Sequence, residues 1–186
     1  MEGLHMQNGR LIAADSSPLL RIVLNGTLFN ISWFVIVISH STAVALAQVA
    51  AHLLFHFLLL GRGAAELRLV ALVSLGGLLL DQLLFLCGVF NIDGRGGVAP
   101  LWLSCLWPVF ATTLVHAFAG LRVRPYVAAL VGGLGGAGSY VAGVRLSEVD
   151  FAMPLWSPLL IAALWALLFP LLLRMGARLV PEREHA

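Results

Sequence analysis

The sequence predicts an all-α polytopic membrane protein, a single bundle of six transmembrane helices with both termini in the cytoplasm. Three observations support this prediction: the composition, the six long apolar stretches and the distribution of arginine. Of the 186 residues, 60% are hydrophobic and only 11% are charged, whereas a soluble domain carries about 25% charged residues. The composition therefore excludes a soluble globular protein.

The first three expected spans follow one another with short connections. The first covers residues 19–39, after the helix-start signal Ser16-Ser17-Pro18, and the second covers residues 43–60. The turn residues Gly61-Arg62-Gly63 precede the third span, which covers residues 69–90 and is followed by the turn residues Asn91-Ile92-Asp93-Gly94. Each stretch suits a bilayer core about 30 Å thick, which a helix of roughly 20 apolar residues crosses.

The last three expected spans each follow a proline, at Pro100, Pro125 and Pro154, as helix starts often do. They cover residues 101–121, 126–144 and 155–173. We therefore expect a cytoplasmic N-terminal segment at residues 1–17, the six-helix domain at residues 18–174 and a cytoplasmic tail at residues 175–186. The short connections leave no room for a soluble domain between the spans.

Arginine sets the predicted orientation, because cytoplasmic segments of membrane proteins carry the excess of basic residues. Nine of the 11 basic residues lie at the N-terminus, in the second and fourth connections or at the C-terminus: Arg10, Arg21, Arg62, Arg68, Arg122, Arg124, Arg174, Arg178 and Arg183. Only Arg95 and Arg145 lie on the other side. The net charge of +2 gives no basic footprint for a nucleic-acid partner.

Glycine is concentrated in the fifth expected span. The run Gly133-Leu134-Gly135-Gly136-Ala137-Gly138 spells a dinucleotide fingerprint, but that motif requires a preceding strand and a soluble βαβ unit. The pattern Gly132-x-x-x-Gly136, continued by Ser139-x-x-x-Gly143, instead lets a second helix approach closely in lipid. We expect this helix to be internal or to form the contact between subunits of a homo-oligomer.

Polar residues inside the spans support a functional hypothesis, because ionisable groups are costly in a membrane and usually face the bundle interior. They are Asn25 and Asn30 in the first span, Gln48, His52 and His56 in the second, Asp81 in the third, and Thr112 and His116 in the fourth. A rise of about 1.5 Å per residue places His56, His116 and Asn25 about 6 to 9 Å from the cytoplasmic ends of their spans. The same count places His52, Thr112, Asn30 and Asp81 at about 12 to 18 Å. We expect one polar cavity that opens toward the cytoplasm, with Trp33 and Trp107 as apolar walls.

Three histidines are the candidates for metal binding. His52 and His56 are four residues apart on one helix face, which is a metal-ligand spacing, although no H-E-x-x-H or E-x-x-H pattern accompanies them. His56 and His116 share a depth on different spans, where they could ligate a haem from both sides. The sequence assigns no metal or cofactor and leaves His52, His56 and His116 as candidates.

Several strings in the chain resemble those of one family: Asn25-x-x-x-Phe29-Asn30-x-x-Trp33-Phe34, Gly77-x-x-x-Asp81-Gln82-Leu83-Leu84, Ala99-Pro100-Leu101-Trp102 and Phe110-Ala111-Thr112-Thr113-Leu114-x-His116. The chain is similar, over nearly its whole length after Leu20, to a proteobacterial inner-membrane family of unknown function. The resemblance implies a small multi-pass protein of the bacterial inner membrane. It also implies an association with enzymes that modify lipid acyl chains.

The leading functional hypothesis is that the polar cavity binds a lipid or fatty-acyl amphiphile and supports lipid modification, with a lipid-modifying enzyme as partner. Asp81 would be its charged centre, His56 and His116 would donate or accept protons, and Asn25, Asn30, His52 and Thr112 would complete the polar lining. One alternative is an intramembrane enzyme, metal-dependent or not, that uses the same histidines. A second alternative is a small-solute transporter, although the chain shows no inverted repeat of broken spans.

Overall fold

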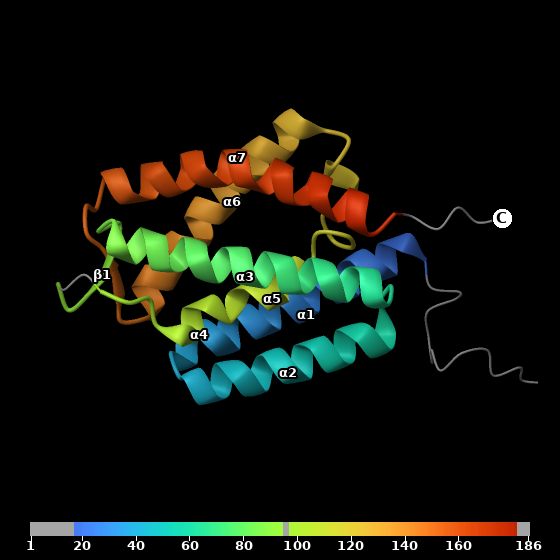
Figure 1. Cartoon of the computed structure of the whole chain (residues 1–186), viewed down its shortest axis with the longest axis horizontal. Coiled ribbons are helices and arrows are strands. Elements are labelled where there is room, and N and C mark those ends of the chain that lie inside the picture. The colour runs from blue at the N-terminus through green and yellow to red at the C-terminus, as the bar shows by residue number, and fades with distance from the viewer. Residues whose placement is uncertain (1–16, 95–96, 182–186) are drawn as a thin grey trace, which may run out of the picture.

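Five helices run through the computed structural model, which describes residues 17–94 and 97–181 (Figure 1). All five are long and apolar enough to cross a membrane: α1 (Pro18–Ser39), α2 (Thr42–Leu59), α3 (Ala64–Leu86), α6 (Pro125–Leu146) and α7 (Trp156–Leu179). They correspond to five of the six expected spans, so the protein is a multi-pass membrane protein. Residues 1–16, 95–96 and 182–186, which include Arg10, Arg95 and Arg183, lie outside the described residues.

The expected start and turn signals are present at the ends of the first helices. Ser17 caps α1, because its Oγ accepts the Leu20 N–H at 3.3 Å. Between α2 and α3, Gly63 has a φ of +90°, a conformation that costs glycine little and other residues much. The helix α3 begins directly after this glycine, at Ala64, more than one turn before the expected start at residue 69.

The fourth expected span, residues 101–121, is not one continuous helix. It consists of α4 (Leu101–Ser104), α5 (Leu106–Ala111), a series of tight turns and the short 3₁₀ helix η1 (Ala119–Leu121). Pro108 has no N–H to donate to the Ser104 carbonyl, so the α-helical bonding is interrupted there. The count of six spanning helices is therefore not confirmed.

This interrupted segment lies inside the bundle, where α5 contacts α1, α2 and α3. Its residues 111–115 are all buried. Irregular backbone is tolerated at membrane depth only where protein or a water-filled cavity surrounds it. The three neighbouring helices supply that surrounding, so the segment can leave the helical conformation without exposing its backbone to lipid.

A short two-stranded ribbon closes the end of the bundle at which α3 ends (Figure 1). The strand β1 (Phe90–Ile92) pairs in antiparallel register with β2 (Val149–Phe151), so that Asn91 lies opposite Asp150. No strand was expected here, because the apolar run of the third span continues to residue 90. Gly88, whose φ is +67°, turns the chain out of the helical conformation after Leu86.

The glycine stripe of α6 packs against α7, its most extensive helix contact. A Cβ added at Gly132 would lie 2.5 Å from the Cβ of Phe169, and one added at Gly136 would overlap the Trp165 ring. The prediction that small residues permit a close helix approach is confirmed for these two positions. The partner in this contact is a helix of the same chain, and the homo-oligomer stays a prediction.

Candidate functional site

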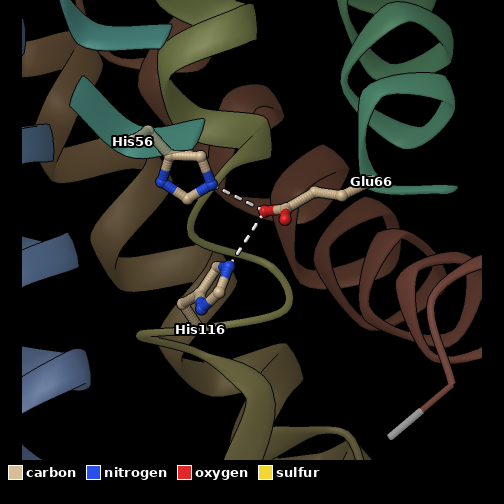
Figure 2. A group of neighbouring side chains, drawn as sticks. All are labelled: His56, Glu66 and His116. Carbon is tan, nitrogen blue, oxygen red and sulfur yellow. Dashed lines mark hydrogen bonds and ion pairs between the residues drawn. The ribbon is translucent and has the colours of Figure 1, made fainter. Parts of the chain in front are cut away.

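Two histidines and one glutamate meet at the end of the bundle opposite the β1–β2 ribbon. Figure 2 shows both imidazole rings pointing toward the same carboxylate oxygen from different segments. His56 Nε2 lies 2.7 Å and His116 Nε2 lies 2.9 Å from Glu66 Oε1. The side chains of His56 and Glu66 have no exposed area, and that of His116 is 1% exposed. We call these three residues the His–Glu cluster.

Each residue of the His–Glu cluster is placed by a different element. His56 lies in the last turn of α2, and Glu66 lies in the first turn of α3, directly after the Gly61-Arg62-Gly63 turn. The backbone N–H of Arg62 donates to Glu66 Oε2 at 2.6 Å, which fixes the second carboxylate oxygen. His116 lies in the tight turns that follow α5, so the interruption of the fourth segment is what turns this ring toward Glu66.

Asn25 on α1 determines which nitrogen of the His56 ring faces a hydrogen-bond donor. A backbone N–H can only donate, so the 3.2 Å contact from Ala117 N identifies Asn25 Oδ1 as the acceptor. The other end of the amide, Nδ2, therefore faces Thr112 O and His56 Nδ1, each at 3.4 Å. Because Nδ1 accepts this hydrogen bond, the proton of His56 is on Nε2, from which it is donated to Glu66.

His52 belongs to a separate group of hydrogen bonds. Its Nδ1 lies 2.9 Å from Ser32 Oγ and its Nε2 lies 3.0 Å from Thr112 Oγ1, while Gln48 donates to the same Ser32 hydroxyl at 2.9 Å. The His52 ring stacks on that of His56, with 6.1 Å between centroids, but none of its atoms belongs to the His–Glu cluster. These contacts join α1, α2 and the segment after α5.

Asp81 is buried on α3, with its carboxylate facing hydrogen-bond donors from three other elements, α4, α5 and α6. Ser104 Oγ and Trp107 Nε1 donate to Oδ2 at 3.1 and 2.9 Å, and Tyr140 of α6 donates to Oδ1 at 3.4 Å. The expectation that Asp81 faces the bundle interior is confirmed, and two of its donors, Ser104 and Trp107, lie in the fourth segment. Among the described residues, no Arg or His side chain forms an ion pair with it.

An aromatic cavity of about 360 Å³ lies beside Asp81. Its walls come from α1, α5, α6 and α7, and include Trp33, Trp107, Phe110, Tyr140, Trp165 and Phe169. Toward the β1–β2 ribbon its lining continues through Phe90, Trp102 and Val149. The volume is within the range of small-molecule sites, roughly 300 to 1,000 Å³.

The structure divides the predicted site residues between these features. Asn30, Trp33, Asp81 and Trp107 line the aromatic cavity, whereas Asn25, His52, His56, Thr112 and His116 do not and belong to the buried hydrogen-bond networks described above. The single cytoplasm-facing polar cavity expected from the sequence is therefore replaced by a mostly aromatic cavity and two buried polar groups. The reason is that α5 packs between the neighbouring helices. It separates the polar faces of α1, α2 and α3, which helical periodicity alone places around one cavity.

Two of the predicted pairings differ from the structure in detail. His56 shares the carboxylate of Glu66 with His116, whereas His52 only stacks on the His56 ring. The Gly61-Arg62-Gly63 turn after α2 brings Glu66 next to His56. The His56 and His116 rings are 5.0 Å apart between centroids and face one carboxylate, which leaves no room for a haem between them. Asn30 donates to Gly26 O of its own helix at 2.8 Å.

Glu66 is the member of the His–Glu cluster that the sequence pattern did not indicate. The expected start of the third span at residue 69 placed it in a connection, where a carboxylate would be solvated. The signal that could have found it is the position of Glu66 three residues after Gly63, in the first turn of a helix, where acidic residues are favoured. Its burial against two imidazoles depends on tertiary contacts.

Comparison with known proteins gives one family. A family model described as "Protein of unknown function (DUF2878)" matches residues 22–171. No curated protein and no solved structure matches the chain. The family match covers four of the long helices completely or nearly so and includes every residue of the His–Glu cluster and Asp81. The chain therefore belongs to the DUF2878 family, as the resemblance of its sequence motifs predicts.

Proposed function

We propose that the protein is a multi-pass protein of the bacterial inner membrane that binds a lipid or fatty-acyl amphiphile in the aromatic cavity, in support of lipid modification by a partner enzyme. The aromatic cavity is the observation that carries this proposal. Its walls are apolar for most of their area, and Asp81 and Tyr140 contribute polar groups on one side. An apolar pocket with a few convergent polar groups is the usual form of a small-molecule site.

One buried donor in the cavity wall, Trp165 Nε1, has no hydrogen-bond acceptor among the described residues. Trp165 is 8% exposed, and its ring lies beside that of Tyr140, with 6.4 Å between centroids. A buried donor without a partner costs about 1 to 3 kcal/mol. An ester, amide or hydroxyl oxygen of a bound amphiphile would supply the acceptor that Trp165 lacks.

The lack of an ion-pair partner for Asp81 among the described residues favours a neutral head group over an anionic one. The carboxylate has hydrogen-bond donors but no cationic partner among the described residues. A second carboxylate, such as that of a free fatty acid, would be buried at this position without a cationic partner, which is costly. We therefore favour an esterified or hydroxylated amphiphile, with its hydrocarbon chain against the aromatic walls.

The experiment compares lipids that co-purify with the wild-type protein and with a variant whose cavity is filled. Gly135 lines the cavity and has open space at its Cβ position, so Gly135→Leu should occupy part of the volume and remove the bound lipid. Gly138, on the same helix, also has open space but does not line the cavity. Gly138→Leu is the matched control and should retain the lipid.

Mass spectrometry of lipid extracts from both variants, at equal protein amounts in a mild detergent, provides the readout. We expect one lipid class enriched over the surrounding membrane in wild type and Gly138→Leu, and depleted at least fivefold in Gly135→Leu. Extracts that match the bulk membrane for all three proteins would contradict the proposal. Equal enrichment in Gly135→Leu would place the bound lipid outside the cavity.

A further inference from the structure

We propose that the His–Glu cluster is a binding site for a divalent transition-metal ion, with Zn²⁺ as its representative. This inference depends on His56, Glu66 and His116 and does not depend on amphiphile binding in the aromatic cavity. The proposal of metal binding and the proposal of lipid binding can therefore be contradicted independently of each other.

The convergence of the three ligand atoms is the first argument. His56 Nε2, His116 Nε2 and one Glu66 oxygen all lie within 4.8 Å of one another. Bonds of about 2.0 to 2.1 Å to one tetrahedral ion place its ligand atoms about 3.3 Å apart. The separations of 2.7 and 2.9 Å from Glu66 Oε1 would have to increase by about half an ångström, which a small rotation of the carboxylate provides.

The charge of the buried carboxylate is the second argument. Glu66 has no exposed area, and its side-chain partners among the described residues are two imidazoles and one backbone N–H. The Asn25 amide faces His56 Nδ1, and the other nitrogen of the same ring faces Glu66. A divalent cation between the three side chains would neutralise the charge of this buried carboxylate, which is otherwise costly where water is excluded.

The donor set selects the class of ion. Two imidazole nitrogens and one carboxylate oxygen suit Zn²⁺ and its first-row neighbours, and the same set with an open fourth position occurs in catalytic zinc sites. Mg²⁺ and Ca²⁺ prefer sites built from oxygen alone. The cluster therefore favours a transition metal and leaves one position for a water molecule or a ligand oxygen.

Asn25 gives the proposal a specific consequence. For His56 Nε2 to bind a metal, the ring proton must be on Nδ1, and that proton needs an acceptor. The Asn25 amide now presents Nδ2 to this position, so metal binding requires the amide to rotate and its Oδ1 to release the Ala117 N–H. Replacement of Asn25 by Asp would present a carboxylate oxygen there instead, and a carboxylate behind a histidine ligand strengthens metal binding.

The test measures Zn²⁺ stoichiometry and affinity in the full-length protein, purified in detergent with a tag that contains no histidine. Elemental analysis and competition with a chromophoric chelator should give one tightly bound Zn²⁺ per chain in wild type. Glu66→Gln and His116→Ala should weaken binding more than about 100-fold, since loss of an outer-shell partner alone costs about 10- to 100-fold. Co²⁺ in the same site should give a visible absorption band that these variants lack.

His52→Gln is the matched control, because His52 is one turn from His56 on the same helix face but contributes no atom to the cluster. It should bind Zn²⁺ as wild type does, and Asn25→Asp should bind at least as tightly as wild type. Circular dichroism and size-exclusion profiles establish that each variant is folded. Absence of Zn²⁺ and Co²⁺ binding by the folded wild-type protein would overturn the proposal, as would equal binding by Glu66→Gln, His116→Ala and wild type.

Discussion

The position of the Asp81 side chain depends on the size of neighbouring residues as well as on their polarity. The Trp107 indole donates to the carboxylate at 2.9 Å, and it reaches this position by lying against α3 at Gly77, one turn before Asp81. A Cβ at Gly77 would overlap the Trp107 ring, whereas a Cβ at the neighbouring Gly76 would meet nothing within 4 Å. The hydrogen bond between Trp107 and Asp81 therefore requires a glycine at position 77.

This contact predicts opposite effects for two adjacent glycines. Gly77→Ala should displace Trp107 from Asp81 and lower the free energy of unfolding by about 1 to 3 kcal/mol, the usual cost of overpacking a buried position. Gly76→Ala should raise it by up to about 1 kcal/mol, because alanine favours the helix more than glycine does. Denaturant unfolding in detergent, followed by tryptophan fluorescence, measures both. Equal stability of the two variants would show that Trp107 can move without cost.

At the scale of elements, α1 stabilises the interrupted segment after α5. Asn25 accepts the Ala117 N–H and donates to Thr112 O and His56 Nδ1. One side chain therefore provides hydrogen-bond partners for two backbone groups of the irregular segment and for one imidazole nitrogen of α2. Asn30, one and a half turns further along α1, bonds only to Gly26 O of its own helix. Two asparagines on one helix therefore have unequal structural roles.

Replacement of each asparagine by leucine should separate these roles. Asn25→Leu leaves a buried N–H, carbonyl and imidazole nitrogen without their partner, and each unsatisfied buried group costs about 1 to 3 kcal/mol. We expect Asn25→Leu to lower the free energy of unfolding by at least about 3 kcal/mol and Asn30→Leu to change it by less than about 1 kcal/mol. Thermal unfolding in detergent provides the comparison. Similar losses for both variants would contradict the assigned role of Asn25.

The sequence predicted the elements that depend on local signals. The cap at Ser17, the turn at Gly63 and the close approach at Gly132 follow from residue type and spacing, and all are present. The sequence pattern predicts one span over residues 101–121, and the turns after Ala111 do not follow from it, because the conformation of residues 112–118 depends on contacts with α1 and α2. Glu66 was missed for the same reason: nothing within one segment indicates that a carboxylate near a turn is buried against two other segments.

At the scale of the whole molecule, the two ends of the bundle carry different chemistry. The His–Glu cluster lies where α2 ends and α3 begins, whereas the lining of the aromatic cavity reaches the β1–β2 ribbon at the opposite end. Glu148 near the ribbon accepts from Trp102 Nε1 at 2.8 Å and pairs with His40 at 2.9 Å. The orientation of the chain in the membrane therefore determines which compartment each site faces.

The excess of arginine predicts that the His–Glu cluster faces the cytoplasm and the ribbon faces the opposite side. Val98 and Val123 test this prediction as a matched pair, since they lie in connections at opposite ends and are 75% and 76% exposed. In a background that lacks the free cysteines Cys87 and Cys105, Val98→Cys should react with a membrane-impermeant thiol reagent in intact cells. Val123→Cys should react only after the membrane is permeabilised. The reverse pattern would place the His–Glu cluster on the outer side, because both sites belong to one bundle and a single orientation fixes them together.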